Sequence, residues 1–153
     1  MKSYSKPKKR KKPYRKTVFE MVCHSDPKEI GCIEQFLQQT NKKLNLDDGT
    51  MYRLLVSCTE AVNNAIIHGN KSALNKSVSI KCIVEKQYLT IRVKDEGKGF
   101  DPEKLQDPRE EKNLMKESGR GVFLMRSLMD SVNVKRLKFG SVVVMKVKLH
   151  KHR

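Results

Sequence analysis

An amphipathic helix that ends in a pair of polar side chains constrains this chain more than any other part of its sequence. Glu60 and Asn64 are four residues apart, so they lie one above the other on a single helix face. A carboxylate and a neutral amide oxygen one turn apart can serve as a proton acceptor and as a ligand for a hard cation. Gly69 follows where a C-terminal cap would end the helix. The helix itself is predicted from apolar residues that recur at spacings of three and four: Met51, Leu54, Leu55, Cys58, Ala61, Val62 and Ala65.

The apolar pattern on either side of this helix predicts two further helices and five strands. Asp26-Pro-Lys-Glu29 carries the capping residues of a helix start, and Gly119-Arg-Gly121 opens the other helix. Short turns join consecutive strands, which argues against a doubly wound parallel sheet. We therefore predict a two-layer α/β sandwich, with three helices on one face of a mixed, mostly antiparallel sheet. The predicted strands cover residues 17–24, 78–84, 89–93, 131–137 and 141–149.

Positive charge is concentrated at the N-terminus. The 153 residues include 33 basic and 17 acidic side chains, a formal charge of +16, and residues 1–16 contain nine of the basic residues and no acid. Such a segment buries too little apolar surface to fold alone, so we predict a disordered basic tail at 1–16 and one domain at 17–150. The tail is either an electrostatic arm for nucleic acid, the ribosome or an acidic protein, or a solubilising segment.

The hydropathy and cysteine patterns favour a cytoplasmic protein. No apolar run reaches the ~18 residues that span a membrane, and no apolar segment follows the basic N-terminus as it does in a signal peptide. The four cysteines form no Cys-x-x-Cys pair, which disfavours a zinc site built from local pairs. Cys58 and Cys82 fall on apolar faces, so we predict that they are small core residues with free thiols, as in a reducing compartment.

Two glycine motifs border a polar segment in the second half of the chain. Asp95-Glu-Gly97-Lys-Gly99 directly follows a predicted strand. Gly119-Arg-Gly121 begins a predicted helix, where free backbone N–H groups and the helix dipole can bind a phosphate. Residues 101–118, between the motifs, are polar and charged, as a loop that covers a ligand can be. The P-loop sequence and the signature set of eukaryotic protein kinases are absent, which excludes those two kinds of nucleotide site.

Together and in this order, the motifs resemble the GHKL superfamily of ATP-binding domains, which includes gyrase, heat-shock chaperones, histidine kinases and MutL. The match covers roughly residues 51–147, and it implies a Bergerat-type ATP-binding fold. Glu60-Ala-Val-Asn-Asn-Ala-Ile-Ile-His68-Gly resembles the N box, residues 95–100 the G1 box and residues 119–130 the G2 box. Within the superfamily, the chain is most similar to the anti-sigma-factor serine kinases of the RsbW and SpoIIAB type, in which Glu-Ala-Val-x-Asn-Ala-Ile-x-His-Gly is characteristic.

The resemblance implies a role for each motif residue. Glu60 would be the general base that accepts the proton of a serine hydroxyl, and Asn64 would bind Mg²⁺ at the phosphates of ATP. Asp95 would accept a hydrogen bond from the adenine amino group, and residues 101–118 would form a lid over the nucleotide. His68 would touch the ribose or phosphates, with a plain helix-end role as the alternative. The remaining residues implied to contact ATP are Gly97, Gly99, Gly119, Arg120 and Gly121.

The same resemblance implies a choice between two protein partners. The kinase would hold a sigma factor away from RNA polymerase, or phosphorylate a serine of a STAS-type anti-anti-sigma protein and so release it. It also implies a homodimer. Two other hypotheses remain open. One is a non-catalytic module in which ATP and Mg²⁺ control a protein interaction. The other is a nucleic-acid-binding protein led by the basic tail, which is not part of the family pattern.

Overall fold

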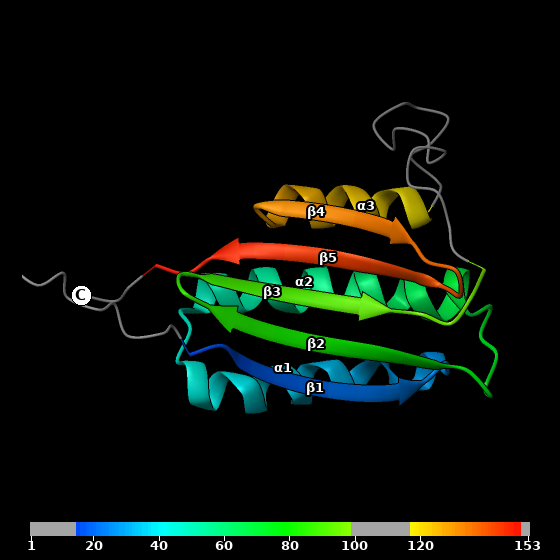
Figure 1. The fold of residues 1–153 in the computed structure, drawn as a ribbon, viewed down its shortest axis with the longest axis horizontal. Helices are drawn as coiled ribbons and strands as arrows, with labels where there is room; N and C mark the ends of the chain where they lie inside the picture. Colours follow the sequence, from blue (N-terminus) through cyan, green and yellow to red (C-terminus); the bar gives the residue numbers. More distant parts are fainter. Residues whose placement is uncertain (1–14, 99–116, 151–153) are drawn as a thin grey trace, which may run out of the picture.

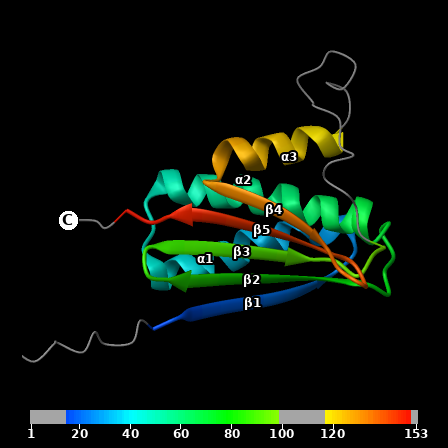
Figure 2. The ribbon, with the colours of Figure 1, turned by 45° about the horizontal axis from the view of Figure 1, so that its top comes forward.

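A computed structural model describes residues 15–98 and 117–150. The sheet has five strands, and the three helices pack against one of its faces, which gives the two layers seen in Figures 1 and 2. The predicted two-layer α/β sandwich is therefore confirmed. The strands are β1 (Thr17–His24), β2 (Ser77–Glu85), β3 (Tyr88–Lys94), β4 (Ser131–Arg136) and β5 (Ser141–Lys148). The helices are α1 (Gly31–Leu44), α2 (Asp48–Asn64) and α3 (Glu117–Leu128), with a 3₁₀ turn η1 (Pro27–Ile30) and a π-helical turn η2 (Ala65–Gly69).

The sheet has the strand order β1-β2-β3-β5-β4, and its four pairs of neighbouring strands are all antiparallel. The mostly antiparallel sheet expected from the sequence thus has no parallel pair among the described strands. Both predicted hairpins are present, and Gly140 turns the second one with a φ of +91°, a backbone conformation that favours glycine. The chain crosses from β3 through α3 to β4, so that β5 returns between β3 and β4.

The core lies between the sheet and the helices, and the alternation of apolar residues along the strands fills it. Ile80, Ile91 and Met145 are fully buried on neighbouring strands, and the apolar stripe of α2 packs against this layer. Fully burying one such side chain contributes about 1.5–3 kcal/mol. Cys58 and Cys82 are completely buried in the same core, as predicted from their positions on apolar faces. In the described ranges, no helix is long and apolar enough to cross a membrane.

Aspartates cap the first two helical starts, and one of them differs from the prediction. Asp47 caps α2, since its carboxylate accepts a hydrogen bond from the backbone N–H of Thr50 at 2.8 Å. Asp26 caps the 3₁₀ turn in the same way. Glu29, however, does not close a capping box on Asp26. Its carboxylate accepts a hydrogen bond from the backbone N–H of His24 at 2.8 Å and so ties the helix start to the end of β1.

The end of the central helix differs from the prediction. Gly69 does not serve as a left-handed cap, because the π-helical turn η2 directly continues α2 through Gly69. The C-cap of η2 is Asn70, whose φ of −86° is right-handed. Glycine is required at position 69 for a different reason. A Cβ there would lie 2.5 Å from Oδ2 of Asp95, so only glycine lets the two segments approach this closely.

Two predicted segments lie mostly outside the described residues. The basic tail at 1–16 is described only at Arg15 and Lys16, which precede β1 without regular structure. The lid at 101–118 is described only where α3 begins, at residue 117. Both segments therefore remain predictions.

Candidate active site

The candidate site lies where the C-terminal half of α2 meets the N-terminal half of α3. These helices pack side by side (Figure 2) and enclose a cavity of about 350 Å³. Residues from α2, η2 and α3 line the cavity: Glu60, Asn63, Asn64, His68, Arg120, Gly121 and Leu124. Five of these were predicted from the sequence to bind ATP or to catalyse its reaction, and the structure brings them together.

The closest approach in the site is between Gly121 and the polar pair on α2. A Cβ on Gly121 would lie 2.7 Å from Oε2 of Glu60 and 3.4 Å from Nδ2 of Asn64. Glycine therefore leaves room for both side chains beside the first turns of α3. Asn64 is buried, with 6% of its surface exposed, whereas Glu60 is half-buried. The amide is thus enclosed by the protein, and the carboxylate keeps access to the cavity that both residues line.

Asp95 lies directly after β3 and is held in a fixed orientation by the backbone. Its Oδ1 accepts hydrogen bonds from the N–H groups of Gly97 at 2.9 Å and Ser141 at 3.1 Å. Burial raises the pKa of Asp95 above the ordinary value of an aspartate, and these two hydrogen bonds and the charge of Lys76 oppose the rise. Position 97 also requires glycine, since a Cβ there would lie 1.8 Å from the carbonyl oxygen of Gly69. The glycine of the G1-like motif thus packs against the end of the N-box-like helix.

Asn70 is a buried residue near the site for which the sequence predicted no role. Its Oδ1 accepts the backbone N–H of Glu96 at 2.8 Å, and its Nδ2 donates to Ser25 Oγ and to the carbonyl of Ser77 at 2.9 Å. Asn70 thereby joins the ends of β1, β2 and β3 around the loop that holds Asp95. A polar side chain directly after Gly69 was the available signal, but its partners are up to 45 residues away in the sequence.

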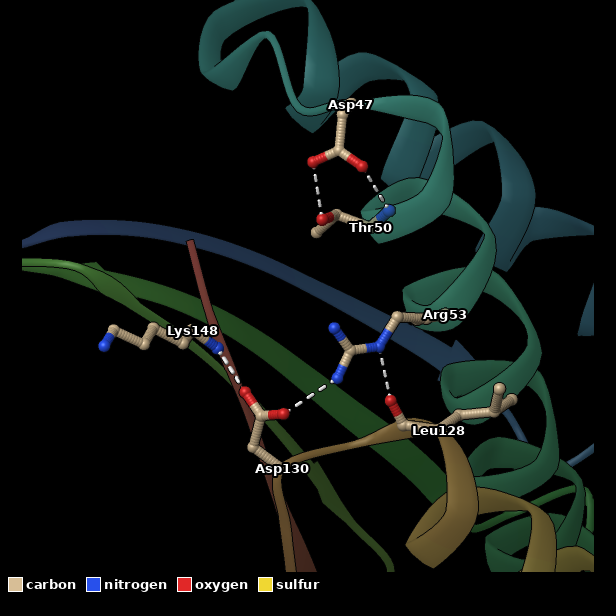
Figure 3. A network of polar contacts seen from close by, with 6 residues as sticks. All are labelled: Asp47, Thr50, Arg53, Leu128, Asp130 and Lys148. Carbon is tan, nitrogen blue, oxygen red and sulfur yellow. Dashed lines mark hydrogen bonds and ion pairs between the residues drawn. The ribbon is translucent and has the colours of Figure 1, made fainter. Parts of the chain in front are cut away.

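Asp130, at the end of the G2-like motif, lies in a different network (Figure 3). Arg53 of α2 donates to its carboxylate at 2.9 Å and also to the carbonyl of Leu128 at the end of α3. The backbone N–H of Lys148 donates to the same carboxylate at 2.6 Å. The hydrogen bond from Lys148 is the main cause that lowers the pKa of Asp130, followed by the hydrogen bond and charge of Arg53. Asp130 therefore ties α3 to α2 and β5, and this part of the motif is structural.

The other predicted contact residues fall into three groups. Asp95 and Gly97 do not line the cavity, but they pack against Gly69, the residue after His68. Gly119 is buried in the first turn of α3 and does not line the cavity. Gly99 lies outside the described residues. The described part of the chain contains no cluster of three His, Cys, Asp or Glu side chains that could hold a metal ion by itself.

The fold and the site together define a histidine kinase-like ATPase domain, since the sequence pattern of that family matches residues 23–147. The chain belongs to this family, and the predicted resemblance to the GHKL superfamily is confirmed.

Two relatives place the chain more closely within the family. It is 32% identical over 121 residues to the serine-protein kinase RsbW of Bacillus subtilis, covering 75% of this chain and 76% of that protein. It is also 32% identical over 118 residues to the anti-sigma F factor of Oceanobacillus iheyensis, covering 76% of this chain and 78% of the relative. At the level of the family, these relatives confirm the predicted class, a protein-serine kinase of the anti-sigma-factor type.

Solved structures support the fold alone, because their sequences are more distant. The chain matches the structure of the RsbU and RsbW domains of a Mycobacterium tuberculosis protein with a TM-score of 0.67 and 11% identity, over 89% of this chain and 33% of that one. It matches the histidine kinase domain of the blue-light-activated kinase of Erythrobacter litoralis with a TM-score of 0.53 and 21% identity, over 76% and 61% of the two chains.

The residues of the site fit a nucleotide and a magnesium ion. The space beside Gly121, which a Cβ would fill, lies next to a carboxylate and a buried amide. An amide oxygen suits Mg²⁺, which usually takes only one or two protein ligands together with water and phosphate oxygens. Arg120 and Gly121, near the start of α3, also line the cavity, and free backbone N–H groups at a helix start can bind a phosphate.

Proposed function

We propose that this chain is an ATP-dependent protein-serine kinase that acts as an anti-sigma factor and phosphorylates a STAS-type anti-anti-sigma protein. The observation that carries this proposal is the meeting of Glu60, Asn64 and Gly121 at one cavity between α2 and α3. The serine-protein kinase RsbW supports the choice of a protein serine as the acceptor, and the anti-sigma F factor supports the anti-sigma role.

Each residue of the site has a distinct part in the proposed reaction. ATP would supply the phosphoryl group and leave as ADP, and a magnesium ion held at Asn64 would supply positive charge to its phosphates. Glu60 accepts the proton of the serine hydroxyl, because its half-buried carboxylate faces the cavity. Asn64 gives its amide oxygen to Mg²⁺, and Arg120 adds positive charge at the phosphate end. Asp95 reads the adenine amino group, since backbone hydrogen bonds hold its carboxylate in one orientation.

The proposed biology has two mutually exclusive complexes. The chain holds a sigma factor in one of them and the unphosphorylated anti-anti-sigma protein in the other. Phosphorylation of the serine adds about two negative charges and releases that partner. The chain works as a homodimer in the cytoplasm, where RNA polymerase is found.

Replacing Glu60 by Gln tests the proposed base. Glu60→Gln keeps the size of the side chain but cannot accept a proton, so phosphotransfer to a purified STAS-domain protein should fall by about 10²–10⁴-fold while Mg-ATP binding persists. Radiolabelled ATP reports the transfer, and titration calorimetry reports the binding. Glu34→Gln, an exposed glutamate of α1, is the matched control and should retain full activity. Equal rates in Glu60→Gln and wild type would refute the assignment.

Asn64→Ala tests the metal ligand separately. Calorimetric binding of ATP should lose its dependence on Mg²⁺ in this variant and keep it in the wild type. If wild type binds Mg-ATP and a partner protein tightly but transfers no phosphate, the alternative holds: a non-catalytic module in which ATP and Mg²⁺ control a protein interaction.

A further inference from the structure

The face of the sheet that carries no helix is basic. In Figure 1 the strands lie in front of the helices, so this open face points toward the viewer. Residues 25–76, which contain α1 and α2, have six basic and six acidic side chains and are neutral overall. The open face has six basic residues and only two acidic ones, all exposed: Lys81, Arg92, Lys94, Lys135, Lys146 and Lys148, with Glu20 and Glu85.

Four of these cations form a line across β3 and β5. The cross-strand pairs of this face are Lys94 with Val142, Arg92 with Val144, Thr90 with Lys146 and Tyr88 with Lys148. Each of the four successive rows therefore contains one cation. Steps along a strand are about 6.6 Å and diagonal steps between strands about 7–8 Å, so the line is roughly 20 Å long. We call Arg92, Lys94, Lys146 and Lys148 the basic sheet face.

The basic sheet face lacks counter-ions in the part of the chain that the structure describes. Lys81 pairs with Glu20 at 3.0 Å on β2 and β1, but no ion pair of the described residues includes any of the four cations. Arg92 neighbours Lys94 along β3 and Lys146 diagonally on β5, so these like charges repel one another. A bound anion would remove this repulsion in all four rows only if its charges also repeat along a line.

We infer that the basic sheet face binds the phosphodiester backbone of a nucleic-acid strand. A single phosphate would fill only one or two rows, whereas a nucleic-acid strand presents one negative charge per nucleotide over the whole length of the line. Tyr88, which is 41% exposed in the last row, offers a ring on which a base can stack. The point where the chain enters the fold adds positive charge at one end of this line. Arg15 and Lys16 directly precede Thr17, which lies at the same end of the sheet as Tyr88 and Lys148.

This inference is independent of the proposed kinase activity. The cavity with Glu60 lies between α2 and α3, on the helical side of the sheet. Charge changes on the open face therefore test nucleic-acid binding without altering the residues assigned to ATP.

Fluorescence anisotropy with a labelled single-stranded 20-nucleotide DNA, titrated with the full chain over a range of NaCl concentrations, tests the inference. The test variant is Arg92→Glu with Lys146→Glu. The matched control is Lys28→Glu with Lys42→Glu, which changes the charge by the same four units on exposed positions of the helical layer. We expect the test variant to bind at least tenfold more weakly at 100 mM NaCl. Its slope of log affinity against log salt should be shallower by about 1.4, because each phosphate contact on a single strand contributes about 0.7 and the variant loses two of them. The control should stay within twofold of the wild type.

Three results would overturn the inference. An equal loss of DNA affinity in both variants would show a general effect of net charge. Unchanged DNA affinity in both variants would assign the binding to the segment before Thr17 and not to the basic sheet face. Tighter binding of labelled polyglutamate than of DNA, lost in the same test variant, would assign the face to an acidic protein. Circular dichroism checks the fold of each variant, and the neutral pair Arg92→Gln with Lys146→Gln replaces the test variant if charge reversal unfolds it.

Discussion

At the scale of single residues, Gly121 decides whether the polar pair on α2 has room to work. Alanine is more favourable than glycine within a helix by about 0.5–1 kcal/mol, so Gly121→Ala should not lower the stability of α3 by itself. Its Cβ, however, would lie 2.7 Å from Oε2 of Glu60, and the flexible carboxylate would have to move away. We expect a thermal midpoint close to that of the wild type but a loss of phosphotransfer of tenfold or more, measured by thermal unfolding and by the kinase assay.

Two other glycines show what would contradict this prediction. Gly31 has no atom within 4 Å of the position of a Cβ, so Gly31→Ala is a control in which both stability and activity should persist. Gly97 faces the backbone carbonyl of Gly69, which cannot move aside as a side chain can, so a substitution there should damage the fold itself. Full activity in Gly121→Ala would show that the position of the Glu60 carboxylate does not limit the reaction.

At the scale of elements, Arg53 joins the N-terminal part of α2 to the C-terminal end of α3, away from the cavity. Its guanidinium donates to the last turn of α3 at Leu128 and to Asp130 on the connection to β4 (Figure 3). Arg53→Met keeps much of the apolar stem but removes both contacts. Because the ion pair is partly exposed, with Asp130 47% exposed, we expect a loss of only about 1 kcal/mol in the free energy of unfolding, measured with urea at pH 7. Arg126→Met, an exposed arginine of α3, is the control and should change stability little.

The ionisation of Asp130 determines how the stability loss in Arg53→Met depends on pH. Its pKa in the folded protein is lowered, mainly by the N–H of Lys148 and then by Arg53, below the value of about 3.9 for an unfolded aspartate. Such a group stabilises the fold fully above the unfolded pKa, and this stability is lost as the pH falls through the folded pKa. The difference in the free energy of unfolding between wild type and Arg53→Met should therefore become smaller in acid. The part that persists should be the contribution of the hydrogen bond from Arg53 to the carbonyl of Leu128. A constant difference from pH 7 to pH 2.5 would contradict the role of the ion pair.

At the scale of the whole molecule, the sequence predicts the elements well and their long-range contacts poorly. The alternation of apolar residues located both ends of all five strands to within one residue, because each strand buries one face against the helices. The spacing of Glu60 and Asn64 predicted that they share a helix face, and the resemblance to the GHKL superfamily predicted that Gly121 joins them at one site. The close packing of Gly69 and Gly97 against distant groups, and the bonds of Asn70 to three strand ends, could not be predicted, because they depend on residues brought together only by folding.

The cysteines test whether the two layers unfold as one unit. Cys23 lies on the edge strand β1, Cys58 on α2 and Cys82 on β2, and all three are buried, whereas Cys32 on α1 is exposed. Burial raises the pKa of Cys58 and Cys82 to about 12 and that of Cys23 to about 11, so their thiols are neutral and unreactive in the folded protein near pH 8.

We therefore expect iodoacetamide at pH 8 to modify Cys32 at once and the three buried cysteines only after unfolding. In intermediate urea concentrations, mass spectrometry of the labelled peptides should show equal rates for Cys23, Cys58 and Cys82, because a single core connects all three. Faster labelling of Cys23 would show that the edge strand opens by itself, which would contradict a single cooperative unit. Mg-ATP, if it binds only the folded chain, should slow the labelling of the three buried thiols by a common factor and leave Cys32 unchanged.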